Sequence, residues 1–169
     1  MNLQLISSVT AECHRIEEDS LFSSKSHFNV SDRWDKFNLI LGVPLAILTA
    51  LGGVAAIKST TTVVVLFSIS ATVLSSLITS LNPSKRAALH KSSAIEYNIL
   101  KNDVRIFREI ELVTPQLTEK EIIERLHIFA NRRNQLNSSS PNIPRWAYEK
   151  TQSDVNNGYT TYHVDKEKS

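Results

Sequence analysis

Residues 52–66 read GGVAAIKSTTTVVVL, and Lys58 within them is the only charged residue from Phe37 to Ser84. The whole chain is 21% charged with a net charge of +2. All its other charged residues therefore lie before or after this stretch, toward the two ends of the sequence. The uncharged runs on either side of Lys58, residues 37–57 and 59–84, are each long enough to cross a bilayer as a helix, which takes about 20 residues. The sequence therefore predicts two spanning helices joined by a short turn.

The alternative is a pair of core helices in a soluble bundle, but such helices normally show a polar face. The first run is rich in Leu, Ile, Val and Phe and is apolar enough to insert alone. The second is diluted by nine Ser and Thr residues between Thr61 and Leu81, so we expect it to insert with its partner as a hairpin. We predict an all-α membrane protein, a transmembrane helical hairpin with N- and C-terminal cytoplasmic helices.

The distribution of Lys and Arg predicts the orientation, because basic flanks favour the cytoplasmic side of a membrane. Lys58 alone lies between the runs, in the expected outer turn, whereas basic residues flank both outer ends: Lys25, Arg33, Lys36, Lys85, Arg86, Lys91 and Lys101. Both termini are therefore expected in the cytoplasm. We expect Trp34, Lys36, Lys85 and Arg86 at the membrane interface. Cys13 is the only cysteine, which excludes a disulfide within the chain and suits a reducing compartment.

The expected boundaries follow from these runs and from local helix signals. Ile6, Val9, Cys13 and Ile16 share one helix face, and SSKSHFNVS at residues 23–31 is interpreted as a break. Asn82-Pro83 predicts the cap of a new helix or a kink. The expected segments are a cytoplasmic amphipathic helix and linker (1–36), a first transmembrane helix (37–57), an outer turn (58–60), a second transmembrane helix (61–82), a cytoplasmic helical region (83–136), and a Pro-containing segment with a disordered tail (137–169).

Two helices are expected within the cytoplasmic helical region, separated by Pro115. The apolar residues predicted to pack the first are Leu89, Ile95, Ile99, Ile106, Ile110 and Val113. Thr118 and Glu121 form a capping-box pattern before the second, whose apolar residues are Ile122, Leu126, Phe129 and Leu136. A short helix is expected around Trp146 and Tyr148, with disorder from residue 151 onward.

Small and hydroxyl residues form one stripe along each predicted span, with alternating spacings of four and three residues. In one interpretation the two stripes face each other and close the hairpin. In the other, the hydroxyl stripe, or the offset pair Ser76 and Ser80, lines a water-filled lumen between several copies. The first stripe is Gly42, Ala46, Thr49, Gly53 and Ala56, and the second is Ser68, Thr72, Ser75, Thr79 and Asn82.

The sequence shows no pattern for catalysis or metal binding. The five histidines are scattered without metal-ligand spacing, and Cys13 and His14 are helix neighbours that point about 100° apart. We therefore expect no enzyme activity, no cofactor and no bound metal. One further interpretation is a basic aromatic patch for a nucleotide, weighed against ordinary packing or headgroup contact, and formed by Arg132, Arg133, Arg145, Trp146 and Tyr148.

Three segments carry a resemblance to a known family: the aromatic membrane edge at residues 34–37 (WDKF), the basic helix KRAALHKSSAIEYNILKNDV at 85–104 with Tyr97 and Leu100, and IPRWAYEK at 143–150. Over about residues 10–150 the chain resembles the SLATT family. These are two-transmembrane effectors that accompany SMODS nucleotidyltransferases and SLOG sensor domains in bacterial conflict systems.

The resemblance implies a pore-forming effector in the bacterial inner membrane that opens or assembles on a cytoplasmic signal and depolarises the cell. It implies a homo-oligomer in the lipid bilayer and an operon-encoded partner, such as a sensor, a nucleotidyltransferase or a reverse transcriptase, without direct binding of nucleic acid. The alternative is a membrane-anchored scaffold that recruits a soluble partner and conducts nothing.

Overall fold

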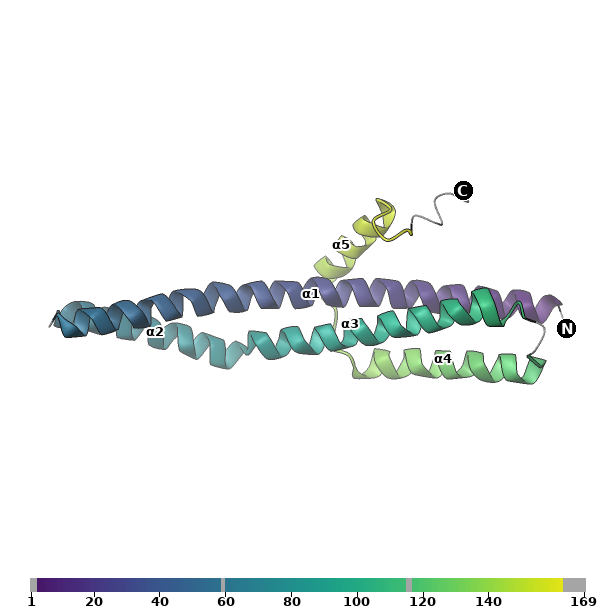
Figure 1. Cartoon of the computed structure of the whole chain (residues 1–169), viewed down its shortest axis with the longest axis horizontal. Helices are drawn as coiled ribbons and strands as arrows, with labels where there is room; N and C mark the ends of the chain where they lie inside the picture. Colours follow the sequence, from purple (N-terminus) through teal and green to yellow (C-terminus); the bar gives the residue numbers. More distant parts are fainter. Residues whose placement is uncertain (1–2, 59, 115–116, 163–169) are drawn as a thin grey trace. The chain divides into compact units, whose positions relative to one another are not determined.

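The computed structural model describes residues 3–58, 60–114 and 117–162, and every regular element in these ranges is helical (Figure 1). The all-α prediction is confirmed at this level. The chain forms two compact units, Ser31–Ala88, here called the hairpin, and Met1–Val30 with Leu89–Ser169, here called the bundle. The elements are α1 (Leu3–Ile57), α2 (Thr61–Leu81), α3 (Pro83–Ile106), a π-helical turn η1 (Phe107–Glu111), α4 (Glu119–Ser139) and α5 (Arg145–Asn156).

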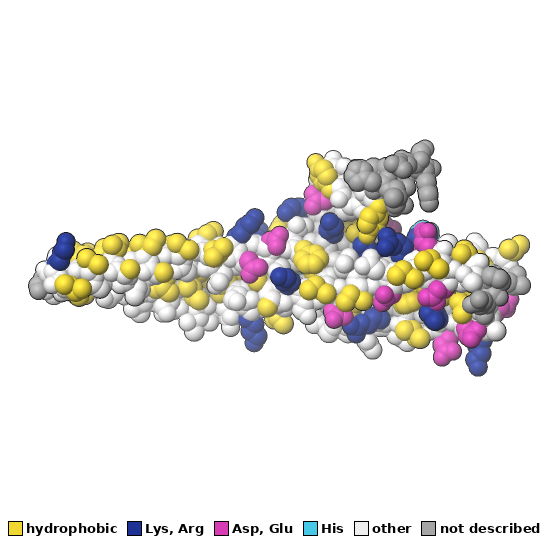
Figure 2. Space-filling view, viewed as in Figure 1, with side chains coloured by type: hydrophobic (Ala, Val, Ile, Leu, Met, Phe, Trp, Pro, Cys, Tyr) yellow, Lys and Arg dark blue, Asp and Glu magenta, His cyan; other side chains and the backbone are white. Residues whose placement is uncertain are grey.

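The hairpin contains the two apolar helical stretches. Each is long and apolar enough to cross a membrane, and its most apolar 18 residues have a mean hydropathy of 2.3 in α1 and 2.0 in the helical segment that begins at Thr61. Only 6% of the first stretch and 0% of the second is buried, unlike a core helix of a soluble protein. Figure 2 shows one face of this exposed apolar surface. The two stretches are therefore suited by length and composition to a lipid environment.

The two helices of the hairpin run antiparallel. Near the open end, the hydroxyl of Ser31 donates a hydrogen bond of 3.0 Å to the carbonyl of Ala87. Nearer the tip, a methyl group placed on Gly52 would lie 3.6 Å from Cβ of Phe67. At the tip, Ile57 ends α1 and Thr61 begins α2, in agreement with the expected turn.

The break expected at residues 23–31 is wrong, because α1 continues through them without interruption. Several of their polar side chains point inward and find partners on neighbouring helices. Ser24 donates to the carbonyl of Ala94 at 2.8 Å, and Ser26 donates to the hydroxyl of Thr151 at 3.0 Å. Burying a hydroxyl costs little free energy when it has a hydrogen-bond partner. This polar segment therefore packs closely against neighbouring helices and is not a linker.

Asn82 and Pro83 form the expected helix boundary. Asn82 adopts a left-handed conformation with φ 45° and caps the C-terminus of α2. Its side-chain oxygen also accepts from the backbone N–H of Lys85 at 3.3 Å. Pro83 begins α3, where a missing N–H has no cost. The chain therefore turns from α2 into α3 at a single residue.

The bundle packs α1, α3 and α4 around one apolar core. The face predicted in the first turns of α1 is confirmed, since Val9, Cys13 and Ile16 are at most 2% exposed and Ile6 packs against them. The capping box of Thr118 and Glu121 is present at the start of α4. The core comprises Val9, Cys13, Ile16, Tyr97, Leu100, Val104, Phe107, Leu112, Ile122 and Leu136, with Leu126 and Phe129 against it.

The prediction for the packed face of α3 is wrong. Tyr97, Leu100 and Val104 are buried, and the six aliphatic residues expected to pack, Leu89, Ile95, Ile99, Ile106, Ile110 and Val113, are between 43% and 72% exposed. The aliphatic pattern misleads because Ala, Tyr and His residues of α3 fill the space beside α1.

The π turn η1 explains why the core pattern changes spacing after α3. The backbone N–H of Leu112 donates to the carbonyl of Phe107 at 2.8 Å, five residues earlier. Phe107 and Leu112 are 0% and 2% exposed, so the extra residue of the π turn brings both onto the core face.

The C-terminal part of the chain is more ordered than expected. The helix predicted around Trp146 and Tyr148 is α5, and it continues to Asn156, so the expected disorder from residue 151 is wrong for residues 151–156. The ring of Tyr148 lies 5.6 Å from that of Phe22 in α1. Pro115 and residues 163–169 lie outside the described residues.

Candidate functional site: the faces of the hairpin

The hairpin is closed by bulky side chains that fit around small ones. In α1 the least exposed row runs through Leu41, Leu45, Leu48, Gly52 and Ala55, and in α2 through Val64, Phe67, Ala71, Leu74 and Ile78. Both rows have the alternating spacing of three and four residues that keeps two antiparallel helices in contact. The fit of Phe67 over Gly52 shows how a large and a small residue interlock.

The two predicted stripes lie beside this contact and not in it. Ala46, Thr49, Gly53 and Ala56 are exposed, and Gly42 is half-buried. Ser68, Thr72, Ser75, Thr79 and Asn82 are all exposed. The interpretation that the stripes face each other and close the hairpin is therefore wrong, because the leucine and phenylalanine rows bury more apolar surface. The pore-lining interpretation stays a prediction.

The exposed hydroxyls donate hydrogen bonds within their own helix. Thr72 donates to the carbonyl of Ser68 at 2.8 Å, and Thr79 donates to the carbonyl of Ser75 at 2.9 Å. Thr49 and Ser76 make the same bond, each at 2.8 Å, to the residue four positions earlier. No water is needed to satisfy these donors. Each hydroxyl oxygen still has lone-pair capacity for water or for another chain.

The small and bulky residues lie on opposite sides of the hairpin. At 3.6 residues per turn, the predicted stripe lies about 90° from the contact row in each helix, and the exposed bulky residues lie about 130° from it in the opposite sense. Since the helices are antiparallel, equal rotations place both stripes on one side, here called the small-residue side. The bulky side is formed by Ile40, Val43, Ile47, Leu51, Val54, Leu66, Ile69, Val73 and Leu77.

The expected interface residues meet at the open end of the hairpin. The guanidinium carbon of Arg86 lies 5.2 Å from the centre of the Trp34 ring, and its Nε donates to the carbonyl of Leu81 at 2.8 Å. Lys36 and Lys85 are exposed. This cation–π pair joins the two helices where a bilayer headgroup region would lie. At the other end, Lys58 is exposed at the tip.

Two buried histidines form a polar contact inside the bundle. Nδ1 of His27 lies 2.8 Å from Nδ1 of His90, and the side chains are 1% and 6% exposed. The His27 ring also stacks on the ring of Tyr97, with 5.7 Å between the ring centres. The Tyr97 hydroxyl donates a hydrogen bond of 2.8 Å to Oδ1 of Asn137. Burial, and then the nearby charge of His90, lower the pKa of His27 to about 4. His27 is therefore neutral at physiological pH.

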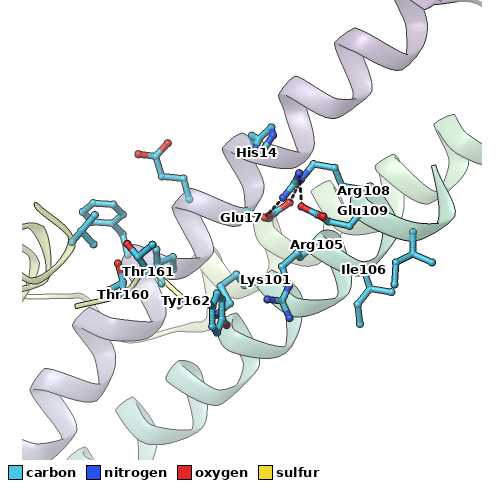
Figure 3. Close-up of a pocket in the computed structure, with 15 residues that line it drawn as sticks. His14, Glu17, Lys101, Arg105, Ile106, Arg108, Glu109, Thr160, Thr161 and Tyr162 are labelled. Atoms are coloured by element: carbon cyan, nitrogen blue, oxygen red, sulfur yellow. Dashed lines mark hydrogen bonds and ion pairs between the residues drawn. The ribbon is translucent and has the colours of Figure 1, made fainter. Parts of the chain in front are cut away.

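The bundle also contains an open cavity of about 690 Å³ (Figure 3). Tyr162 covers part of it, with the Arg105 guanidinium carbon 5.0 Å from its ring centre. Arg108 points toward Glu17 and Glu109 (Figure 3) and holds Glu17 at 2.6 Å. The charged lining is balanced, with Glu17, Glu18 and Glu109 against Lys101, Arg105 and Arg108, so the cavity shows no preference for an anion.

The arginines of the nucleotide interpretation do not form one basic surface. Arg132 pairs with Glu96, Arg133 with Asp19 at 3.2 Å, and Arg145 with Glu149 at 2.6 Å. Within residues 3–58, 60–114 and 117–162, no three His, Cys, Asp or Glu side chains are placed to hold a metal ion. Burial raises the pKa of the Cys13 thiol to about 11, which makes it a poor nucleophile at neutral pH.

No family model, curated protein or solved structure matches this chain. The histidine pair and the buried serines were not predicted from the sequence, although the spacing of these residues indicates their burial. Ser20, Ser24, His27 and Ser31 continue the three- and four-residue spacing of the core face of α1, so these polar residues occupy core positions.

Proposed function

We propose that the protein is a pore-forming effector of the bacterial inner membrane, as the resemblance to the SLATT family implies. In this proposal the hairpin spans the bilayer, and several copies assemble or open on a cytoplasmic signal. The membrane potential then collapses, and the cell dies or stops growing. An infection-sensing system of this kind would use the leak to stop phage replication.

The observation that carries this proposal is the two-sided hairpin. The bulky side carries mostly large aliphatic residues and is suited to lipid, whereas the small-residue side carries most of the hydroxyls that the hairpin contact leaves uncovered. Helix association in lipid favours small residues and hydroxyls, which allow close approach. Several hairpins that turn their small-residue sides inward would enclose a lumen lined by Ser68, Thr72, Ser75 and Thr79.

The charge distribution supports the proposed orientation. Basic residues lie on the segments that precede the first span and follow the second, and Lys58 alone lies between the spans. With both termini in the cytoplasm, the entire bundle is available to a cytoplasmic partner. An operon-encoded sensor, nucleotidyltransferase or reverse transcriptase is the class of partner that the resemblance implies.

The proposal is tested by expressing the chain with its operon neighbours and following a potential-sensitive dye. Replacing Ser68, Thr72, Ser75 and Thr79 together by leucine should abolish depolarisation, because the bulk would fill the lumen. The matched control is Ser70→Leu, a hydroxyl residue of α2 away from the stripe, which should leave depolarisation intact. Loss of activity in Ser76→Leu with Ser80→Leu, but not in the fourfold variant, would move the lumen to the offset pair.

The competing function is the non-conducting scaffold. If the wild-type chain never depolarises cells in the presence of every operon neighbour and an active trigger, the pore is excluded. Co-purification of a soluble partner with the bundle would then favour the scaffold.

A further inference from the structure

One face of α3 and of the following turn η1 carries large aliphatic residues that the described part of the bundle leaves exposed. Ile95, Ile99, Ile106 and Ile110, here called the isoleucine row, are 43%, 48%, 45% and 60% exposed. The buried residues of α3 lie on the opposite side of the helix. Four isoleucines in one row are an unusual surface for a helix of a soluble unit, so the row is suited to cover by another apolar surface.

The spacing of the row fits a helix of the same kind. Ile95, Ile99 and Ile106 are separated by four and seven residues, and position 102 completes the alternation of four, three and four residues. This is the seam period of a coiled coil. Position 102 is Asn102, at a d position of this pattern, where the two asparagine side chains of a parallel pair would lie side by side and could hydrogen-bond to each other.

The charges beside the row indicate how that helix would be oriented. On one flank of the row, Arg105 immediately precedes Ile106, and Lys91 lies on the same flank. On the other flank, Glu96 immediately follows Ile95, and Asp103 immediately follows Asn102. In a parallel pair these flanks meet, so that Lys91 of one copy lies near Glu96 of the other. In an antiparallel pair about the same centre, Lys91 would face Arg105 and Glu96 would face Asp103. Like charges would therefore oppose an antiparallel contact.

We propose that the isoleucine row is the seam of a parallel, self-complementary contact with α3 of a second copy of this chain. The occupant is a second copy because one sequence supplies the apolar row, the asparagine and both charged flanks. The inference rests on the proposed function for its orientation, since copies inserted with the same topology in one membrane are parallel. Glu96 also pairs with Arg132 of its own chain, so the exposed Lys91 of the second copy would be a second cation beside that carboxylate.

The first test is cross-linking of the full chain in membranes, on a Cys13→Ser background. In a parallel seam the two copies of position 102 are adjacent, so Asn102→Cys should form a disulfide-linked dimer under mild oxidation. Ile128→Cys, on an exposed face of α4 (59% exposed), is the matched control. We expect at least about tenfold more dimer for Asn102→Cys. Equal yields at the two positions would overturn the proposal.

The second test is the mass of the purified full chain in detergent or nanodiscs. Ile99→Asp with Ile106→Asp should shift it from oligomer toward monomer, and Ile123→Asp with Ile128→Asp should not. Both pairs are exposed, so far-UV circular dichroism should show unchanged helix content. An oligomer that survives the first pair overturns the seam. If the oligomer and the cross-link at position 102 are both present but cells are not depolarised, the pore proposal is rejected and the proposed contact between copies remains.

Discussion

The Nδ1 atoms of His27 and His90 lie 2.8 Å apart in the interior of the bundle. A neutral imidazole has one N–H, so one ring donates and the other accepts in this contact. If both rings were protonated to imidazolium, two donors and two positive charges would face each other. The contact thus exists only while at least one ring is neutral, which ties the packing of α1 against α3 to pH.

We predict that acid destabilises the bundle. The folded-state pKa of His27 is lowered from 6.5 to about 4, so the unfolded chain binds more protons between these values and stability falls as pH falls. The loss from pH 7 to pH 4 should be on the order of 3 kcal/mol. Thermal unfolding in detergent would measure it. His27→Gln should flatten this pH dependence, whereas His127→Gln, at an exposed site of α4, should not.

We predict that Arg108 and Glu17 are coupled in stability. The guanidinium makes two bonds to the carboxylate, of 2.6 and 3.1 Å, and the side chains are only 16% and 15% exposed. A double-mutant cycle with Arg108→Gln and Glu17→Gln should give a coupling of about 1–3 kcal/mol. The same cycle at Arg145 and Glu149, which are 90% and 55% exposed, should give less than about 0.5 kcal/mol. Equal couplings would show that burial contributes nothing here.

We predict that Ser20→Ala stabilises the protein. Ser20 is 0% exposed, and its hydroxyl has no hydrogen-bond partner among the described residues. Removing a buried, unpaired hydroxyl should raise stability by about 1 kcal/mol, or the melting temperature by about 2–4 °C. Ser24→Ala is the control, because Ser24 donates to Ala94 and its loss should destabilise. A lower melting temperature for Ser20→Ala would indicate a partner for this hydroxyl.

The hairpin was predictable because its signal is physical and strong. A charge is costly in lipid, so the absence of charge on both sides of Lys58 marks the two apolar helices and the turn between them. Helix ends with side-chain caps were equally clear, at Asn82 and at Thr118. These features depend on residues close in sequence, where spacing alone determines which groups can meet.

The faces of the helices were not predictable in the same way. Small residues in an apolar helix suggest close packing, yet in the hairpin the contact is made by Leu48 and Phe67 around Gly52. On α3 the isoleucines suggest a core, yet Tyr97 and His90 pack inward because α1 presents His27 and serines to them. Which face is buried depends on the shape of a partner helix distant in sequence, and a single-helix pattern does not contain that information.

The proposed topology places Lys58 outside the cell and the bundle inside. Lys58→Cys should react on intact cells with a membrane-impermeant maleimide too large for a narrow pore, and Lys120→Cys, on exposed α4, should react only after lysis. The native thiol should not interfere, since Cys13 is 0% exposed and its pKa of about 11 leaves little thiolate at pH 7. Because the two helices of the hairpin are antiparallel, residues 36 and 85 must lie on the same side of the membrane if both helices cross it. Labelling of position 58 only after lysis would therefore contradict the orientation, and labelling of both positions on intact cells would contradict the spanning hairpin itself.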